Sequence, residues 1–600
     1  MKKLLLGLMT CIVFPAMAQM PVLVKDINTT SFFSDSDPGS FIEYNGKTYF
    51  SADDGINGEE LWVTDGTTAG TMMVKDVNPG ASHALVVPII VFNGKLYFSA
   101  STSAGRELWY TDGTAAGTQM LADIKPGNGS SSMHSFFIAG NKLYFRADNG
   151  VNGDEYWVTD GTSAGTKMIK DINPGAGGQE ASVKGIAYQN KFYFYGYDAT
   201  LKRQLWVTDG TTAGTIMLTP PTANNNNTLI DYDMIVFNNK LYFTFHTSAP
   251  FQTDDVELWV TDGTVAGTQL FKDLAPGSSS GWPSHFHIFN NKLLFLSLTY
   301  TSTYRVLMSS DGIAAGTVVI TPLDVLGAKE NWTPWNGKLY FEGSATQGNR
   351  ELYVTDGTAA GTYMIKDINP GSSTSGIENI TVAGNKLFFS AITATNGVEL
   401  WVSDGTGPGT QLVKDINPGT NGAIVQNLNY FNNKLYFTAR QSQTDFQLFE
   451  TDGTTAGTRI VSPANATVTM SPLAPTSFGG RPGVMKVANN NLYFSANYTN
   501  AGFELYKIGG TVSSTGKPVN DQAITIYPNP VTEKLHLNLP ESSTTKHLTA
   551  TIINATGQTV LKSNLSEKAI DVQLLAPGIY YLVVTDNQRG TAYQKTFVKQ

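Results

Sequence analysis

Three short phrases repeat about ten times along most of the chain, and this repeat constrains the fold more than any other feature. The clearest copy reads NGKLYF at residues 93–98 and ELWYTDGT at 107–114, and a third phrase, MVKDV at 73–77, lies before this copy. Because a repeat of this kind fixes the architecture, a residue that recurs in most copies serves the repeated unit before it serves any unique site.

The aspartate of the DGT triplet gives the period of the repeat. Asp65 and Asp112 are 47 residues apart, and the later spacings stay between 45 and 53 residues. This period fits a propeller blade. Helical repeats of about 40 to 47 residues exist, but short aromatic and β-branched runs bounded by Gly, Asn and Asp exclude them here. The nine aspartates are Asp65, Asp112, Asp160, Asp209, Asp262, Asp311, Asp356, Asp404 and Asp452, and a tenth, degenerate copy covers residues 504–511.

Each unit is predicted to form four antiparallel strands. In the second unit these cover residues 89–92, 95–100, 107–111 and 119–124. The Asn-Gly pair at 93–94 is a strong hairpin signal, because both residues can adopt positive φ. Four-stranded sheets repeated around an axis make a β-propeller. We therefore predict an all-β fold with a propeller of about ten four-stranded blades.

The two ends of the repeat region are out of phase in a way that predicts ring closure. Residues 22–27 carry the phrase that normally follows DGT, whereas the last copy at 504–511 lacks it. The first segment is therefore expected to supply the outer strand of the last blade, which leaves no strand edge open. Typical propellers have four to eight blades, so ten units permit one ten-bladed ring or two five-bladed rings. A single ring is favoured because no linker interrupts the midpoint.

The Glu-Leu-Trp-x-x-Asp-Gly-Thr phrase resembles that of a bacterial family of secreted proteins named for this ELWxxDGT motif, over about residues 20–511. The resemblance implies a secreted repeat protein and brings no established chemistry. Gln204, Val306 and Gln447 stand where the Glu is usual. These three departures argue against a carboxylate whose charge every blade requires.

Residues 1–18 are predicted to be a signal peptide. Lys2 and Lys3 precede an apolar run, and the small residues before Ala18 suit cleavage after that position. The run is too short to span a bilayer, which needs about 20 residues. The only cysteine, Cys11, lies within this segment, so the mature chain is expected to have no disulfide and no cysteine site.

After a linker at 512–521, residues 522–600 are predicted to form a small β-sandwich of seven short strands. Their motifs resemble a type A sorting domain of the type IX secretion system. That resemblance implies transport across the outer membrane of a Gram-negative bacterium by machinery that recognises residues 522–600, with the product then released or attached to the cell surface. The residues that carry the resemblance are Tyr527, Pro528, Asn529, Pro530, Gly557, Pro577, Gly578, Tyr580, Lys595 and Lys599.

The bulk composition limits the partners. A net charge of −9 and a pI of about 5.4 disfavour nucleic acid and anionic membrane surfaces. Charged residues make up only 15% of the chain, below the usual quarter or so. The abundant Asn, Thr, Ser and Gly make neutral, hydrogen-bonding loops that suit either sugars or an inert surface. We expect a monomer without a membrane span.

The residues that recur in most blades are interpreted as structural. The tryptophans could offer stacking platforms for glycans, but recurrence at one strand position indicates packing between blades. The DGT aspartates could bind cations, but a carboxylate in a turn commonly accepts backbone N–H bonds. This structural set comprises Trp62, Asp65, Trp109, Asp112, Trp157, Asp160, Trp206, Asp209, Trp259, Asp262, Trp401 and Asp404.

Two oxygen-rich loops, at 53–60 and 148–155, are weak candidates for calcium, which takes six to eight oxygen ligands. Their spacing is not that of an EF-hand loop, and no other cofactor is predicted. His285 and His287 are two apart on a predicted strand and so should face one side, but no third zinc ligand is identifiable. The calcium candidates are Asp53, Asp54, Asn57, Asp148, Asn152 and Asp154.

The leading functional hypothesis is a non-enzymatic, surface-displayed or released module that binds an extracellular glycan or protein. A secreted carbohydrate-active enzyme (a glycosidase or lyase) and a structural surface spacer are the alternatives. The sequence has no nucleophile elbow, zincin helix or phosphate loop, although two carboxylates suffice for glycoside cleavage. An enzyme should gather unrepeated acids or histidines in one pocket, and a glycan binder should expose aromatics beyond the repeated tryptophans. A spacer should do neither.

Overall fold

The chain forms two compact units, residues 1–509 and 510–600. In the part of the chain that the structure describes, no helix is long and apolar enough to cross a membrane. The computed structural model describes residues 20–31, 34–175, 184–198, 202–220, 233–246, 255–277, 279–300, 302, 305–321, 332–344, 349–371, 373–441, 446–463, 485–499, 502–509, 525–527, 531–538, 548–554, 559–565, 568–576, 578–586 and 591–599.

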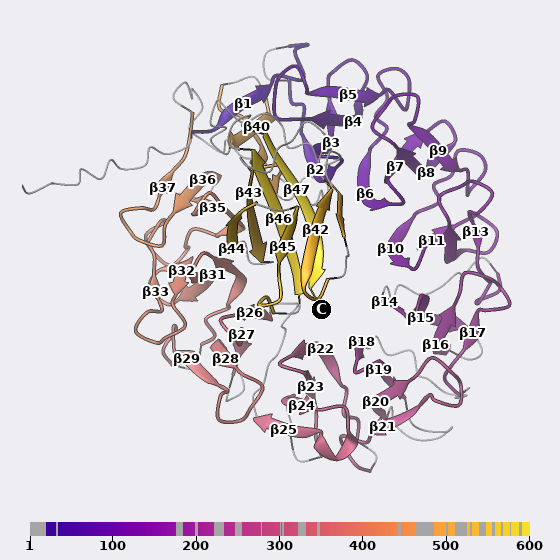
Figure 1. Ribbon diagram of the computed structural model, residues 1–600, viewed down its shortest axis with the longest axis vertical. Coiled ribbons are helices and arrows are strands. Elements are labelled where there is room, and N and C mark those ends of the chain that lie inside the picture. Colours follow the sequence, from indigo (N-terminus) through magenta and orange to yellow (C-terminus); the bar gives the residue numbers. More distant parts are fainter. Residues whose placement is uncertain are drawn as a thin grey trace, which may run out of the picture. The chain divides into compact units, whose positions relative to one another are not determined.

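Among these residues, the first unit contains ten four-stranded antiparallel sheets, here called blades 1 to 10. Within blades 1 to 9 the strands follow in chain order from the innermost to the outermost (Figure 1). Blades 1 to 5 are β2 (Gly39–Tyr44), β3 (Lys47–Asp53), β4 (Glu59–Thr64), β5 (Met72–Lys75); β6 (Val87–Phe92), β7 (Lys95–Thr102), β8 (Gly105–Thr111), β9 (Gln119–Ala122); β10 (His134–Ala139), β11 (Lys142–Asp148), β12 (Asp154–Thr159), β13 (Lys167–Met168); β14 (Gly185–Tyr188), β15 (Lys191–Asp198), β16 (Lys202–Thr208), β17 (Ile216–Met217); and β18 (Met234–Phe237), β19 (Lys240–His246), β20 (Val256–Thr261), β21 (Gln269–Lys272).

The remaining blades continue the same order, and a short 3-10 helix, η1 (Ala314–Gly316), interrupts blade 6. Blades 6 to 10 are β22 (Ser284–Phe289), β23 (Lys292–Ser297), β24 (Val306–Ser310), β25 (Val318–Thr321); β26 (Thr333–Trp335), β27 (Lys338–Gly343), β28 (Glu351–Thr355), β29 (Tyr363–Lys366); β30 (Glu378–Ala383), β31 (Lys386–Thr393), β32 (Gly397–Ser403), β33 (Gln411–Leu412); β34 (Gln426–Phe431), β35 (Lys434–Arg440), β36 (Phe446–Thr451), β37 (Arg459–Ile460); and β38 (Met485–Ala488), β39 (Asn491–Ala496), β40 (Glu504–Gly509) with β1 (Val22–Lys25).

Local sequence explains the strand boundaries. Asn93 and Gly94 both have positive φ, 45° and 70°, which matches the right-handed twist of the strands that they join. In the second strand of that blade, Leu96, Tyr97 and Phe98 are all fully buried. A strand packed on both faces reads as a continuous apolar run, as expected for a sheet between two neighbours.

The blades form one ring of ten, because each apolar cluster of this unit is shared by two consecutive blades. Leu258 of blade 5 packs in one cluster with Phe295 of blade 6, so the sequence midpoint is not a boundary between two rings. Phe50 of blade 1 packs with Tyr493 of blade 10, which closes the circle (Figure 1). The predicted propeller and the favoured single ring are confirmed.

The ring closes through β1, the first strand of the described residues. β1 pairs antiparallel with β40, with Val22 opposite Lys507 and Leu23 opposite Tyr506. The buried side chain of Glu504 adds to this closure, because its Oε2 accepts the backbone N–H of Ile27 at 2.8 Å. The out-of-phase chain ends therefore meet in blade 10, as the sequence predicted.

The second unit is a small sandwich of two sheets around one apolar core. The core includes Leu535, Ile552, Leu582 and Phe597. One sheet has the order β41-β42-β45 and the other β44-β43-β46-β47. Its strands are β41 (Thr525–Tyr527), β42 (Lys534–Asn538), β43 (Leu548–Asn554), β44 (Thr559–Asn564), β45 (Ala569–Asp571), β46 (Gly578–Asp586) and β47 (Thr591–Lys599).

Candidate functional site

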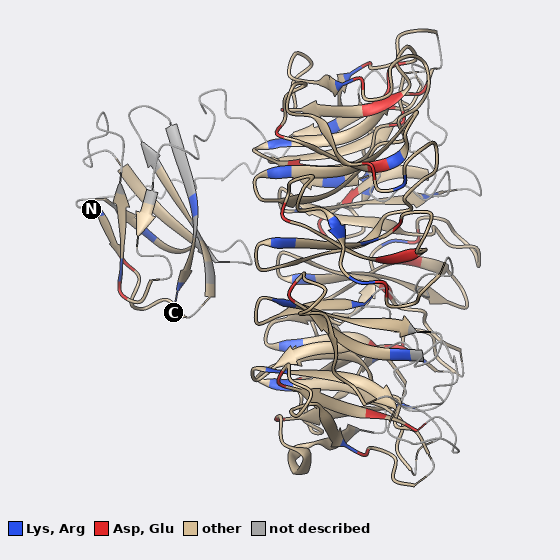
Figure 2. Ribbon diagram, turned by 90° about the vertical axis from the view of Figure 1, so that its right-hand side faces the viewer, with Lys and Arg blue, Asp and Glu red and all other residues tan. Residues whose placement is uncertain are grey.

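The blades have two chemically different ends. At one end, here called the turn face, lie the hairpin between the first and second strands and the DGT turn between the third and fourth strands. At the other end, here called the loop face, lie the loop between the second and third strands and the connection to the next blade. Lys and Arg line one edge of the blades (Figure 2), and in nine blades the second strand begins with lysine at the hairpin: Lys47, Lys95, Lys142, Lys191, Lys240, Lys292, Lys338, Lys386 and Lys434.

The DGT turns are nearly identical in geometry. Asp112 Oδ1 accepts the hydroxyl of Thr114 at 2.7 Å and its backbone N–H at 2.9 Å, and these bonds lower the pKa of the carboxyl. A Cβ at Gly117 would lie 2.1 Å from the same carboxylate, so the turn accepts only glycine there. The two bonds recur at Asp65, Asp160, Asp209, Asp262, Asp356, Asp404 and Asp452.

The repeated tryptophans lie at the interfaces between blades. Trp62 is 5% exposed, within the cluster shared by blades 10 and 1. Trp206, Trp259 and Trp401 are also buried, and the partly buried Trp109 and Trp157 pack against the clusters of their own interfaces. These rings contact neighbouring blades rather than presenting an open face to a ligand.

On the loop face, the repeated glutamate holds the connection to the next blade. Glu60 is fully buried, and its two oxygens accept the backbone N–H groups of Val77 at 2.9 Å and Asn78 at 3.1 Å. Burial raises the pKa of this carboxyl to about 7. In blade 4 the equivalent Gln204 accepts the hydroxyl of Thr219 at 2.6 Å. The position therefore needs an acceptor rather than a charge.

Three positions near the loop face differ from blade to blade, although the backbone around them repeats. The fifth residue of the second strand is Ser99 in blade 2, Arg146 in blade 3 and Glu342 in blade 7. The residue before the repeated glutamate is Arg106 in blade 2 and Asp154 in blade 3. The first residue of the innermost strand varies in the same way. Chemical variation is thus marked at the loop face, whereas the DGT turns of the turn face keep one geometry in eight blades.

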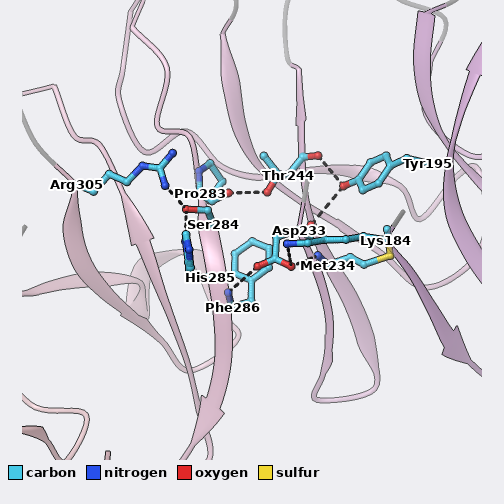
Figure 3. Close-up of polar contacts among 10 residues, drawn as sticks. All are labelled: Lys184, Tyr195, Asp233, Met234, Thr244, Pro283, Ser284, His285, Phe286 and Arg305. Carbon is cyan, nitrogen blue, oxygen red and sulfur yellow. Dashed lines mark hydrogen bonds and ion pairs between the residues drawn. The ribbon is translucent and has the colours of Figure 1, made fainter. Parts of the chain in front are cut away.

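One of these variable groups spans blades 4, 5 and 6 (Figure 3). Asp233 of blade 5 lies at its centre: one oxygen is 3.3 Å from the ammonium of Lys184 before β14. The other oxygen accepts the backbone N–H of Phe286 in β22 at 2.9 Å. One carboxylate therefore links the innermost strands of three consecutive blades.

A second set of contacts surrounds Ser284 at the start of β22. Arg305 Nη1 donates to Ser284 Oγ at 2.9 Å, and the ring Nδ1 of His285 lies 3.1 Å from the same oxygen (Figure 3). Thr244 Oγ1 donates to the carbonyl of Pro283 at 2.6 Å, which ties blade 5 to this segment. The group thus combines three cationic or titratable side chains, Lys184, His285 and Arg305, with one acid.

The expectation that His285 and His287 share a side rested on regular strand alternation, which is broken here. His285 has a φ of 57°, and the register shifts between Ser284 and His287. The ring of His287 stacks on Trp332 at 6.0 Å, and burial lowers its pKa.

The candidate calcium ligands are engaged by other groups of the protein. Asp54 Oδ1 accepts the backbone N–H groups of Ile56 and Asn57, and Asp53 Oδ1 accepts that of Gly55. In the second loop, Asp148 contacts Lys125, Asp154 contacts Arg146 and His134, and Asn152 donates to Asp171. Within the described ranges, no group of three or more His, Cys, Asp or Glu side chains could hold a metal ion.

Part of the predicted sorting signal lies on described strands. Tyr580 stacks on Phe597 and donates to the carbonyl of Ala576 at 2.8 Å, and Lys599 pairs with Gly578 across β46 and β47. Tyr527 is exposed and stacks on His536, and Lys595 lies on β47. The signal peptide with Cys11 and Ala18, the linker at 512–521, and Pro528, Asn529, Pro530, Gly557 and Pro577 lie outside the described residues.

Residues 525–600 match the family model of the secretion system C-terminal sorting domain. The protein is therefore secreted through the type IX system, and its location is extracellular or at the cell surface. The predicted sorting domain and location are confirmed. The match covers residues 525–600 and says nothing of the role of the propeller.

Similarity to solved structures concerns the fold alone. The chain is 11% identical to a puromycin hydrolase over 55% of its own length and 53% of that chain, about half of the hydrolase, with a TM-score of 0.30. It is 14% identical to the propeller domain of the trilobed protease from Pyrococcus furiosus, covering 64% of this chain and 98% of that one (TM-score 0.26). PorZ, a surface component of the type IX system of Porphyromonas gingivalis, is 11% identical over 95% and 88% of the two chains (TM-score 0.21). No curated protein matches the chain.

Proposed function

We propose that the secreted propeller is a non-enzymatic binding module for an extracellular glycan or protein, and that the loop face is its binding surface. The observation that carries this proposal is the contrast between the two faces. The DGT turns repeat one geometry from blade to blade, whereas the loop face carries the side chains that differ between blades. In repeat proteins, insertions and sequence differences commonly collect on the binding face, and loops on a rigid scaffold carry function.

Several weak contacts around one ring would act together. A ligand that spans neighbouring blades gains affinity from each contact after the first, because the later contacts form within the same complex. A long polysaccharide or a matrix protein fits this mode better than a small molecule. We further propose, from the repeated phrase, that residues 20–511 place the chain in the ELWxxDGT-repeat family.

A binding screen tests the proposal directly. The mature full-length chain is applied to arrays of glycans and matrix proteins, with calcium and with chelator, and the bound fraction is measured. Saturable binding to at least one class is expected, whereas failure to bind any ligand under both conditions would overturn the proposal in favour of a structural spacer. Release of new reducing ends from a bound glycan would replace it by a carbohydrate-active enzyme.

A further inference from the structure

We propose that the methionines of the outermost strands are sacrificial oxidation sites, whose thioethers consume hypochlorous acid or peroxide before these oxidants reach the repeated tryptophans. The inference concerns the outer rim of the ring and is independent of the binding proposed for the loop face. It begins with one repeated position of the outermost strand, which holds five of the chain's 15 methionines. They are Met73, Met120, Met168, Met217 and Met364.

Each of these methionines lies directly opposite the repeated aromatic residue of the neighbouring strand. Met73 is paired with Trp62, and Met217 is paired with Trp206. Residues opposite each other in an antiparallel pair have Cβ atoms about 4.5–5.5 Å apart on the same face of the sheet. In the same way, Met120, Met168 and Met364 lie opposite Trp109, Trp157 and Tyr353.

The methionine covers the tryptophan on the side of the outer rim. Met73 packs against the apolar cluster that contains Trp62, and Met217 packs against the cluster that contains Trp206. Both methionines are partly buried, whereas the two tryptophans are only 5% and 8% exposed. The strand that carries the methionine is the outermost of its sheet (Figure 1). An oxidant that approaches a blade from the rim therefore meets the sulfur before the indole.

The chemistry of the two side chains favours reaction at sulfur. A thioether is soft and polarizable, and its oxidation gives methionine sulfoxide. With hypochlorous acid the sulfur gives up two electrons and gains one oxygen atom, and the chlorine leaves as chloride together with a proton. With hydrogen peroxide the O–O bond breaks and water leaves. The sulfoxide can be reduced back to methionine, whereas oxidation of the indole damages an aromatic contact between blades.

Methionine is the only source of sulfur in the blades. The one cysteine of the chain, Cys11, precedes all of them, so no thiol in the ring competes for the oxidant. The protein is secreted, and the reductants that protect sulfur in the cytosol do not act outside the cell. The outer rim therefore faces oxidants with methionine as its reactive group.

Packing alone does not require methionine at this position. Leu412 occupies it in blade 8, opposite Trp401, and packs against the cluster of that tryptophan. Leucine and methionine have similar volumes and replace each other at little cost. Lys170 also lies over the ring of Trp206, 5.1 Å from its centre. The effect of the sulfur is therefore isolated by exchanging the two residues within their own blades.

The experiment treats the mature full-length protein with increasing amounts of hypochlorous acid and stops the reaction with free methionine. Peptide mass spectrometry then gives the oxidised fraction of each methionine and tryptophan. In the wild type, Met217 should be oxidised at lower doses than Trp206. M217L should raise the oxidation of Trp206 several-fold at a given dose, and L412M should lower that of Trp401 by a similar factor.

M308L is the matched control, because Met308 lies on the third strand of blade 6 and is only 3% exposed. It should leave the oxidation of every tryptophan unchanged. Equal thermal midpoints of the variants and the wild type would show that altered folding does not cause the differences. If M217L alone lowers the midpoint, L412M decides the test.

Two results would overturn the proposal. The first is oxidation of Trp206 before Met217 in the wild type, since the sulfur would then not react first. The second is unchanged oxidation of Trp206 in M217L and of Trp401 in L412M, since the methionines would then consume oxidant without protecting the ring beside them. Neither result bears on binding at the loop face.

Discussion

The closure of the ring depends on a buried carboxyl group, and its geometry predicts an unusual response to substitution. Glu504 is fully buried, and burial raises its pKa from 4.5 to about 7. Its Oε2 accepts both the N–H of Ile27 and the hydroxyl of Ser36, at 2.8 and 2.6 Å. Oε1 has no partner within hydrogen-bond geometry, although the backbone N–H of Asn28 acts on the same carboxyl and helps to lower its pKa. In E504Q the amide oxygen can take the place of Oε2 and keep both bonds, while the amide nitrogen replaces the unused oxygen.

The sign of the pH effect follows from the raised pKa. The closed ring binds a proton at Glu504 more tightly than the opened ring does, so this contribution is fully present below pH 4.5 and is lost as the pH rises through about 7. At about 1.36 kcal/mol for each pKa unit, the loss between pH 5 and pH 8 is about 2 kcal/mol. Glutamine does not titrate, so the E504Q variant should not show this loss of stability. At pH 8 its β1 should therefore be held more tightly in blade 10 than β1 of the wild type.

Hydrogen exchange of the backbone amides of β1 measures the opening of this strand, after correction for the intrinsic rates. The wild type should lose protection between pH 5 and pH 8, and E504Q should lose little. E60Q is the matched control, since both oxygens of Glu60 accept backbone N–H groups. Its amide nitrogen would face a donor, which costs roughly 1–3 kcal/mol relative to the ionised carboxylate. An equal pH slope in the wild type and E504Q would refute the reasoning.

Three further predictions concern export, the turn and the closing strand. Deleting residues 522–600 should leave the propeller in the periplasm when cell fractions are probed with antibody, and normal surface display would contradict the role of the sorting domain. G117A should lower the free energy of unfolding by about 1–3 kcal/mol, because its Cβ would lie 2.1 Å from the Asp112 carboxylate; A115S in the same turn is the control, and equal denaturation midpoints would count against the turn geometry. Removing residues 20–27 should expose the edge of β40 and cause concentration-dependent association in light scattering, whereas a stable monomer would argue against closure by β1.

The sequence allowed the blade, its strands and the closure to be predicted because each depends on local patterns. The Asn-Gly pair before Lys95 and the phase difference between residues 22–27 and 504–511 are visible without coordinates. The role of Glu60 was only partly visible: Gln204 indicated that the charge is dispensable, but the bond to Val77 crosses 17 residues of chain.

The candidate site was harder to predict, because its contacts join residues of different blades. Lys184, Asp233 and Phe286 are separated by about 50 residues each, and none belongs to a motif. Strand periodicity does not reveal the positive φ of His285 or the shifted register. The prediction that His285 and His287 face the same side assumed a regular strand, and this strand is irregular.

The pairing of β1 with β40 also sets the timing of assembly. β1 is synthesised before all the blades, whereas its partner β40 is synthesised with the last blade. Val22 and Lys507 can therefore pair only after every blade has been made. A chain interrupted after any blade keeps an unsatisfied first strand. A protease that cleaves an unpaired β1 would therefore degrade incomplete chains and leave complete ones intact.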